Sequence, residues 1–156
     1  MKLYKEIQKL PFWIPFGVFF SGCCILLFQL SVPQLNHFML AFGGVLSAVV
    51  ALLLYVVRLD INIQPGVFTY RLYPFQVRFR EITFADVHEI SIRKYSPILE
   101  YGGWGIRFGK SGNAVNLKGN MGVQFLFKDG RKLLIGTSQA DSIRLAIAEA
   151  GFIPRP

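Results

Sequence analysis

The chain has 156 residues, of which 53% are hydrophobic and 17% charged, and its formal net charge is +8. This charged fraction is low for a protein surrounded by water, and the charged residues gather towards the two ends of the chain. The sequence gives no support to a metalloenzyme or a hydrolase, because it shows neither metal-ligand spacing of His, Cys and Asp nor a nucleophile beside an evident base. We therefore expect no catalytic site, no metal and no cofactor.

The first ten residues predict a short amphipathic helix that lies along lipid headgroups. Lysines occupy one side of it, and the apolar residues fall at helical spacing. These apolar residues are Leu3, Tyr4, Ile7 and Leu10.

The next stretch, Leu10 to Val57, is forty-eight residues long and contains no Asp, Glu, Lys or Arg. About 20 apolar residues in a helix are enough to cross a bilayer. Two runs, Trp13 to Leu30 and His37 to Val57, reach that length, and the polar, proline-containing segment Ser31 to Asn36 between them predicts a reversal. The sequence therefore predicts a transmembrane hairpin in a domain over 1–57, followed by a second domain over 58–156.

Basic residues flank the predicted hairpin, and its short connection has none. The positive-inside rule then places both termini in the cytoplasm, which predicts a multi-pass protein of the inner membrane. A cleaved signal peptide is the competing interpretation of the N-terminus. We reject it because the apolar run is longer than a signal's and a second run follows at once.

Small residues recur at intervals of four along the second run. They predict a face for close helix packing, either against the first helix or against a second copy or another membrane protein. The residues are Gly43, Gly44, Ser47, Ala48 and Ala51.

After Arg58 the apolar pattern changes to the period of a strand. Segments with this period cover residues 59–64, 67–72, 76–80, 87–94, 104–108, 122–128 and 132–135, with 114–117 as a weaker candidate. Asp129-Gly130 predicts a two-residue type I′ hairpin turn. His88 has the parity of Ile90 and Ile92, which predicts a histidine near the rim of the core.

The C-terminal segment predicts one helix over about 138–150, with Ser138 or Thr137 as its N-cap and Gly151 at its end. The predicted fold class is thus an α+β membrane protein. In it a two-helix transmembrane hairpin precedes a seven-stranded antiparallel barrel or sandwich that the helix caps.

A resemblance to a known family follows from this architecture together with four segments. They are Tyr101-Gly102-Gly103-Trp104-Gly105-Ile106-Arg107, Gly119-x-x-Gly122-Val123, Asp129-Gly130 and Leu134-Ile135-Gly136-Thr137. The chain resembles bacterial membrane-anchored pleckstrin-homology-like (PH-like) proteins. The resemblance implies a bent antiparallel barrel that serves as a binding or assembly module and not as a catalyst.

Two surfaces are candidates for binding. A basic set would hold the domain on anionic lipid: Arg71, Arg78, Arg80, Arg93, Lys94, Arg131 and Lys132. Aromatic and arginine residues in a glycine-rich segment would contact a protein partner: Tyr101, Trp104 and Arg107. The alternative for the basic set is an ordinary solvated surface, and the alternative for Trp104 is that it fills the core.

We therefore expect a non-catalytic scaffold or interaction module at the cytoplasmic membrane face. An anionic-lipid-binding module and a subunit of a membrane enzyme or transport complex remain as alternatives. Expected partners are membrane lipids, a second copy in a homo-oligomer or another membrane protein. Nucleic acid is not expected, because the membrane topology accounts for most of the positive charge.

Overall fold

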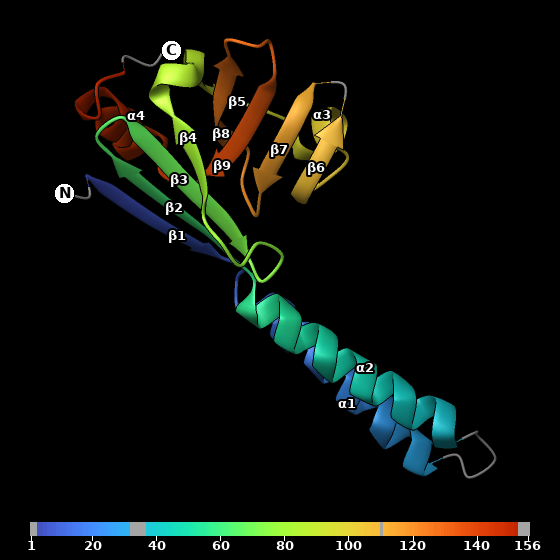
Figure 1. The fold of residues 1–156 in the computed structure, drawn as a ribbon. Coiled ribbons are helices and arrows are strands. Elements are labelled where there is room, and N and C mark those ends of the chain that lie inside the picture. The colour runs from blue at the N-terminus through green and yellow to red at the C-terminus, as the bar shows by residue number, and fades with distance from the viewer. Residues whose placement is uncertain (1–2, 32–36, 110, 153–156) are drawn as a thin grey trace. The chain divides into compact units, whose positions relative to one another are not determined.

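The computed structural model describes residues 3–31, 37–109 and 111–152 (Figure 1). It divides the chain into two compact units. The helical unit is Lys9–Val57, and the β unit combines Met1–Gln8 with Arg58–Pro156. The N-terminal residues, which the sequence analysis grouped with the hairpin, are thus part of the β unit.

The helical unit contains α1 (Trp13–Ser31) and α2 (His37–Val56). The predicted reversal over residues 32–36 lies outside the described residues. The expectation of a transmembrane hairpin is wrong, and with it the predicted multi-pass location in the inner membrane. In the described ranges no helix combines the length and the apolar character that a membrane crossing requires. A charge-free run in a sequence gives only the composition of a segment, whereas a crossing also needs that segment to form one sufficiently long apolar helix.

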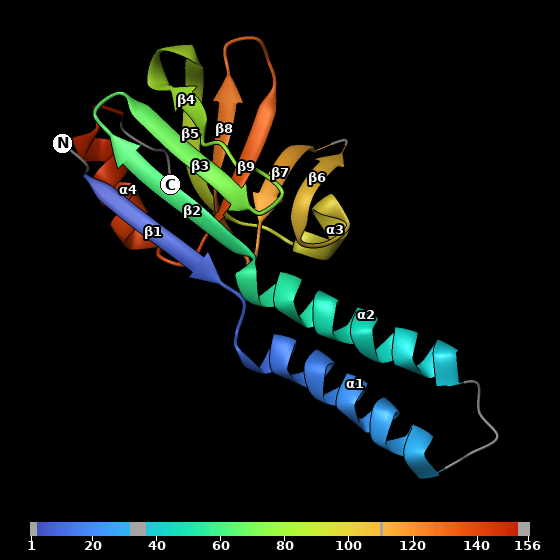
Figure 2. The same cartoon turned by 60° about the horizontal axis from the view of Figure 1, so that its bottom comes forward.

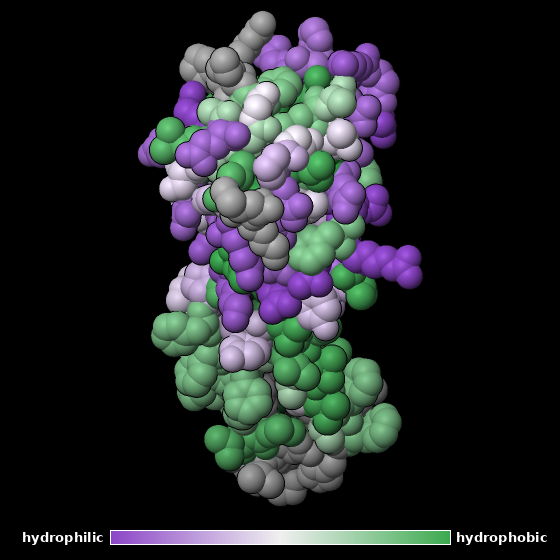
Figure 3. All heavy atoms as spheres, turned by 60° about the vertical axis from the view of Figure 1, so that its left-hand side comes forward, coloured by the Kyte–Doolittle hydropathy of each residue, from purple (hydrophilic) through white to green (hydrophobic). Residues whose placement is uncertain are grey.

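The two helices pack closely through small residues. A side-chain carbon added to Gly22 would lie 2.6 Å from Ser47 Cβ, and one added to Gly44 would lie 2.7 Å from Leu26 Cδ2. At Gly22 this approach leaves no room for a larger residue, whereas at Gly44 the Leu26 side chain would have to move. The outward side chains of both helices are largely apolar, as the green surface in Figure 3 shows.

The β unit contains two sheets. One has the order β1-β2-β3-β4 and the other has the order β5-β8-β9-β7-β6 (Figures 1 and 2). The strand bounds are β1 (Tyr4–Lys9), β2 (Arg58–Gln64), β3 (Val67–Tyr73), β4 (Arg80–Thr83), β5 (Val87–Lys94), β6 (Gly105–Gly109), β7 (Gly112–Asn116), β8 (Met121–Phe127) and β9 (Lys132–Thr137). The predicted all-antiparallel barrel is also wrong, because β7 pairs with β9 in parallel.

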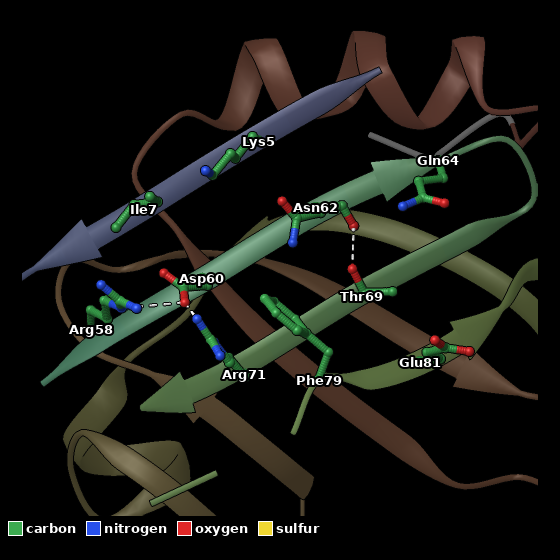
Figure 4. Close-up of a pocket in the computed structure, with 10 residues that line it drawn as sticks. All are labelled: Lys5, Ile7, Arg58, Asp60, Asn62, Gln64, Thr69, Arg71, Phe79 and Glu81. Carbon is green, nitrogen blue, oxygen red and sulfur yellow. Dashed lines mark hydrogen bonds and ion pairs between the residues drawn. The ribbon is translucent and has the colours of Figure 1, made fainter. Parts of the chain in front are cut away.

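Strand β1 replaces the amphipathic helix expected at the N-terminus. Glu6 and Gln8 are buried, whereas Lys5, Ile7 and Lys9 are exposed, which is the period of two that a strand produces. β1 runs opposite to its neighbour β2 in Figure 4, and Leu3 N donates to Ile63 O. The helical prediction was wrong because it followed the apolar residues, while the strand buries its polar ones.

The core lies between the two sheets and helix α4 (Ala140–Glu149). The Phe68 and Phe125 rings meet edge to face across the sheets, with centroids 4.9 Å apart. The other large side chains of the core that are at most 1% exposed come from the apolar faces that the sequence predicts for the strands and the C-terminal helix. These are Leu59, Ile61, Ile63, Leu72, Ile90, Leu134, Ile135, Ile143 and Ile147.

The segment predicted as a strand over 76–80 is a connection instead, and β4 begins at Arg80. Gln76 causes this departure: its N–H donates to Leu72 O at 2.7 Å, and its side-chain oxygen accepts from Leu72 N. Arg71 also donates to Val77 O. Val77 is consequently 70% exposed, and the apolar alternation here does not mark a buried face.

Two further expectations fail locally. His88 is exposed, because the pairing of β5 with β8 shifts register between Val87 and Glu89. The β8–β9 turn is not type I′, which needs positive φ at two residues; in this turn Gly130 alone has it, with φ 83°.

Helix α4 begins two residues after the expected start, with Gln139 as its N-cap, and Gly151 follows its end with φ 98°. Gly66 N, in the β2–β3 turn, donates to Ala150 O at the end of α4. Two short helices complete the β unit, the 3₁₀ helix η1 (Phe84–Asp86) and α3 (Pro97–Tyr101).

Candidate functional site

A polar groove of about 470 Å³ lies on the face of the β1–β4 sheet that points away from the core. Its walls come from all four strands and from the segment before β4 (Figure 4). The lining residues are Lys5, Ile7, Arg58, Asp60, Asn62, Gln64, Thr69, Arg71, Phe79 and Glu81.

The register of the strands builds this groove. On β2, Leu59, Ile61 and Ile63 point into the core, so Asp60 and Asn62 must point to the opposite face. β3 places Arg71 opposite Asp60 and Thr69 opposite Asn62. Polar side chains therefore meet in cross-strand pairs along the floor of the groove.

Asp60 is the most buried charged residue of the groove, at 4% exposed. Its Oδ2 atom accepts a hydrogen bond from Arg71 Nε at 2.7 Å and lies 3.4 Å from Arg58 Nε. Two guanidinium groups therefore share one oxygen of a single carboxylate. This arrangement compensates the charge of Asp60 and leaves its second oxygen, Oδ1, outside the ion pairs.

Arg71 is held on several sides. It donates to Val77 O, and its guanidinium carbon lies 4.3 Å from the centre of the Phe79 ring. The Tyr73 ring is also near, with 5.8 Å between that carbon and the ring centre. Arg71 thus fixes the β3–β4 connection and positions Asp60 at the same time.

Two buried oxygens at the floor are unpaired. Within the described part of the chain, neither Asp60 Oδ1 nor Asn62 Oδ1 has a hydrogen-bond partner. Asn62 is 7% exposed, and the Thr69 hydroxyl donates to its backbone oxygen instead of its side chain. A buried acceptor without a donor typically costs about 1–3 kcal/mol, so two of them in one groove require an explanation.

Strand β1 contributes Lys5 and Ile7 to the groove, and buried polar contacts hold it in place. Glu6 accepts from Ser138 N at 2.8 Å, from the Thr137 hydroxyl at 2.7 Å and from the Tyr4 hydroxyl. Gln8 Nε2 donates to Gly136 O at 2.9 Å. Burial, followed by the charge of Glu6, raises the pKa of Tyr4. These contacts tie the N-terminus to the junction of β9 and α4.

The basic residues predicted to contact lipid do not form one surface. Arg71 lies in the groove, while Arg80, Arg131 and Lys132 line a separate hollow of about 630 Å³. Arg93 lies on the other sheet and donates to Glu100 at 2.7 Å. Arg78 and Lys94 are exposed.

The three predicted partner-contact residues have different environments. Tyr101 is 6% exposed and packs edge to face against Tyr95, so it is a core residue. Trp104 is 46% exposed, and its backbone oxygen accepts from Arg107 Nε. The exposed part of this set is thus Trp104 with Arg107.

The small residues predicted for helix packing also divide. Gly44 and Ser47 lie against α1, and Ala51 is 6% exposed. A side chain at Gly43 would meet nothing within 4 Å. Ala48 is exposed and lines an apolar hollow on the helical unit.

No group of three or more His, Cys, Asp or Glu side chains within the described ranges could hold a metal ion. The expected absence of metal and cofactor stays a prediction. The groove itself was missed, because alternating polar residues on β2 were interpreted as solvent-facing. A signal was present in the Asp and Asn of β2, since these residues are unfavourable in strands unless something holds them.

The chain was also compared with known proteins. No protein-family model, curated protein or solved structure matches it. The resemblance to membrane-anchored PH-like proteins accordingly stays a prediction.

Proposed function

We propose that the chain is a non-catalytic interaction module whose binding site is the polar groove of the β1–β4 sheet. The observation that carries this proposal is the pair of unpaired acceptors, Asp60 Oδ1 and Asn62 Oδ1, at the floor of a groove in which the other oxygen of Asp60 is already paired with two arginines. A ligand that donates hydrogen bonds to them would recover the free energy that their burial costs.

The frame of the groove supports a role in binding. Its floor belongs to paired strands, and Arg71 is fixed by Asp60, Val77 and Phe79. Groups held on rigid elements lose little entropy when a ligand arrives. The volume of about 470 Å³ is in the usual range for sites of small molecules.

The chemistry of the lining residues also favours binding over reaction. Asp60 is engaged by two arginines, and the Thr69 hydroxyl donates to Asn62 O. Neither arrangement resembles a nucleophile activated by a neighbouring base. The groups in the groove are suited to orient a ligand.

A titration of the ¹⁵N-labelled full-length chain, followed by NMR, tests this function. The probes are glucose, inorganic phosphate and arginine, which represent neutral, anionic and cationic ligands. We expect at least one of them to shift the amide signals of residues 58–64 and 67–73, and the Asn62→Leu variant to lose that response.

Asn113→Leu is the matched control, because Asn113 is an exposed strand residue outside the groove. It should respond as the unmodified chain does. The proposal fails if all three probes leave the groove signals unchanged, or if Asn62→Leu responds like the unmodified chain.

A further inference from the structure

The groove combines hydrogen-bond acceptors with an excess of positive charge. Lys5, Arg58 and Arg71 line it together with two carboxylates, Asp60 and Glu81. A cationic ligand would deliver donors to Asp60 Oδ1, but only beside the two arginines that already share this carboxylate. Cations are therefore disfavoured at the floor.

Anions are disfavoured for a different reason. A fully ionised phosphate or carboxylate has acceptors only, so it has no hydrogen to donate to Asp60 Oδ1 or Asn62 Oδ1. It would also lie against the carboxylate of Asp60. The floor requires a ligand that donates hydrogen bonds without carrying either charge.

We propose, on the basis of the function proposed above, that the groove binds a neutral polyhydroxylated molecule of the saccharide class. A hydroxyl group donates one hydrogen bond and accepts others, so neighbouring hydroxyls can serve acceptors and donors in one site. The acceptors are Asp60 Oδ1 and Asn62 Oδ1. The donors are Lys5 Nζ and the terminal nitrogens of Arg58, which make no hydrogen bond within the described ranges; the Arg58 guanidinium lies over the Tyr73 ring.

The apolar part of the groove fits the same ligand. Ile7 is 47% exposed and Phe79 is 42% exposed, and both line the groove beside its polar floor. Saccharide rings carry C–H groups between their hydroxyls, and such groups pack well on aliphatic and aromatic side chains. A site with a polar floor and two apolar residues beside it matches this mixed surface.

An extended peptide fits less well. Peptides that add to a sheet bind through its free strand edge, where backbone N–H and C=O groups are unpaired. The groove lies on the face of the sheet, and the backbone of β2 and β3 beneath it is paired. Recognition at this face must come from side chains.

The floor oxygens have almost no exposed surface, so a side chain must move to admit a hydroxyl. Lys5 is exposed and has a long, flexible stem, whereas Arg71 is held by its contacts. We expect a change of the Lys5 rotamer to open the floor.

The experiment compares ligands that have the same sugar ring and differ in charge. The full-length chain is titrated with glucose, glucosamine and glucose 6-phosphate, with maltose and lactose as larger neutral probes. A neutral probe should shift the signals of residues 58–64, and its dissociation constant should be at least threefold lower than that of either charged analogue. Asn62→Leu should weaken its binding at least tenfold, and Asn113→Leu should not.

Thermal unfolding of each variant without ligand establishes that the variant is folded. A second variant, Lys5→Met, keeps the apolar stem of the side chain and removes its charge. It should lower the affinity for neutral ligands less than Asn62→Leu does. The saccharide inference is overturned if a charged probe binds the groove more tightly than every neutral one, while the proposed function then stands. If no probe of any charge affects the groove, both are overturned.

Discussion

Each of the two sheets has an arginine that pairs with a carboxylate, but the two carboxylates differ in whether both of their oxygens are hydrogen-bonded. Glu100 of helix α3, which pairs with Arg93 of β5, uses both oxygens: Oε2 accepts from Arg93 at 2.7 Å and Oε1 accepts from Ser96 N at 2.8 Å. On the β1–β4 sheet, both arginines meet one oxygen of Asp60, and Oδ1 has no partner among the described residues.

This difference is the reason why we propose ligand binding at Asp60 and assign a structural role to Glu100. Glu100 fastens the start of helix α3 to strand β5, and its hydrogen bonds account for its conformation. Asp60 is more buried, yet it retains an unused acceptor beside a second one on Asn62. The groove has two unpaired buried acceptors on one strand, whereas the unpaired buried atom beside Arg93 and Glu100 is a single donor, Gln124 Nε2.

The largest effect is expected from breaking the ion pair in the groove. Arg71→Met leaves Asp60 with Arg58 alone and removes the hydrogen bond to Val77 O. Loss of one partner from a buried pair should lower the free energy of unfolding by about 2–3 kcal/mol, measured in urea. The double variant Asp60→Leu, Arg71→Met should recover most of that loss, and an unchanged midpoint in the single variant would contradict the role of Arg71.

The buried carboxylate of β1 should behave like Glu100, because its oxygens are also used. Glu6→Ala removes the acceptor of Ser138 N and of the Thr137 hydroxyl. We expect a loss of about 1–3 kcal/mol in stability and faster amide hydrogen exchange along β1. Lys9→Ala, at an exposed position of the same strand, should leave exchange unchanged; equal rates in the two variants would refute the tether.

The pH dependence of stability tests whether the Arg93–Glu100 pair is structural. The hydrogen bond from Arg93 holds the pKa of Glu100 below its ordinary value of 4.5. The folded state therefore gains stability from this group above that pH, and loses the contribution as the pH falls through the lowered pKa. The Glu100→Gln variant should show a weaker fall in unfolding midpoint between pH 6 and pH 3. Parallel curves would show that the pair contributes nothing.

The smallest effect on stability is expected at Asn62. Replacing an amide with an unpaired buried oxygen by an apolar side chain of similar size removes a desolvation cost, so Asn62→Leu should not lower the free energy of unfolding and should raise it by at most about 1 kcal/mol. Its effect on ligand binding should nevertheless be large. A loss of several kcal/mol in urea unfolding would show that Asn62 is structural and not kept for a ligand.

The sequence by itself determined the strands whose one face is apolar, because alternation of apolar and polar residues depends only on local geometry. Leu59, Ile61 and Ile63 were assigned to the core in this way, and they are fully buried. The C-terminal helix followed from its apolar stripe and from Gly151. The local pattern predicts the wrong environment at His88 and at Val77. A register shift changes the first and a side-chain contact changes the second, and neither has a periodic signal in the sequence.

Only the tertiary structure decided the groove and the place of the N-terminus. Strand β1 buries Glu6 and Gln8 against partners more than a hundred residues away, so its apolar spacing indicated the wrong element. Asp60 and Asn62 have the sequence pattern of solvent-facing residues, and they became buried when β1, Arg71 and Phe79 assembled around them. Contacts between distant segments set the burial of a polar side chain, and a single sequence does not encode those contacts in any local period.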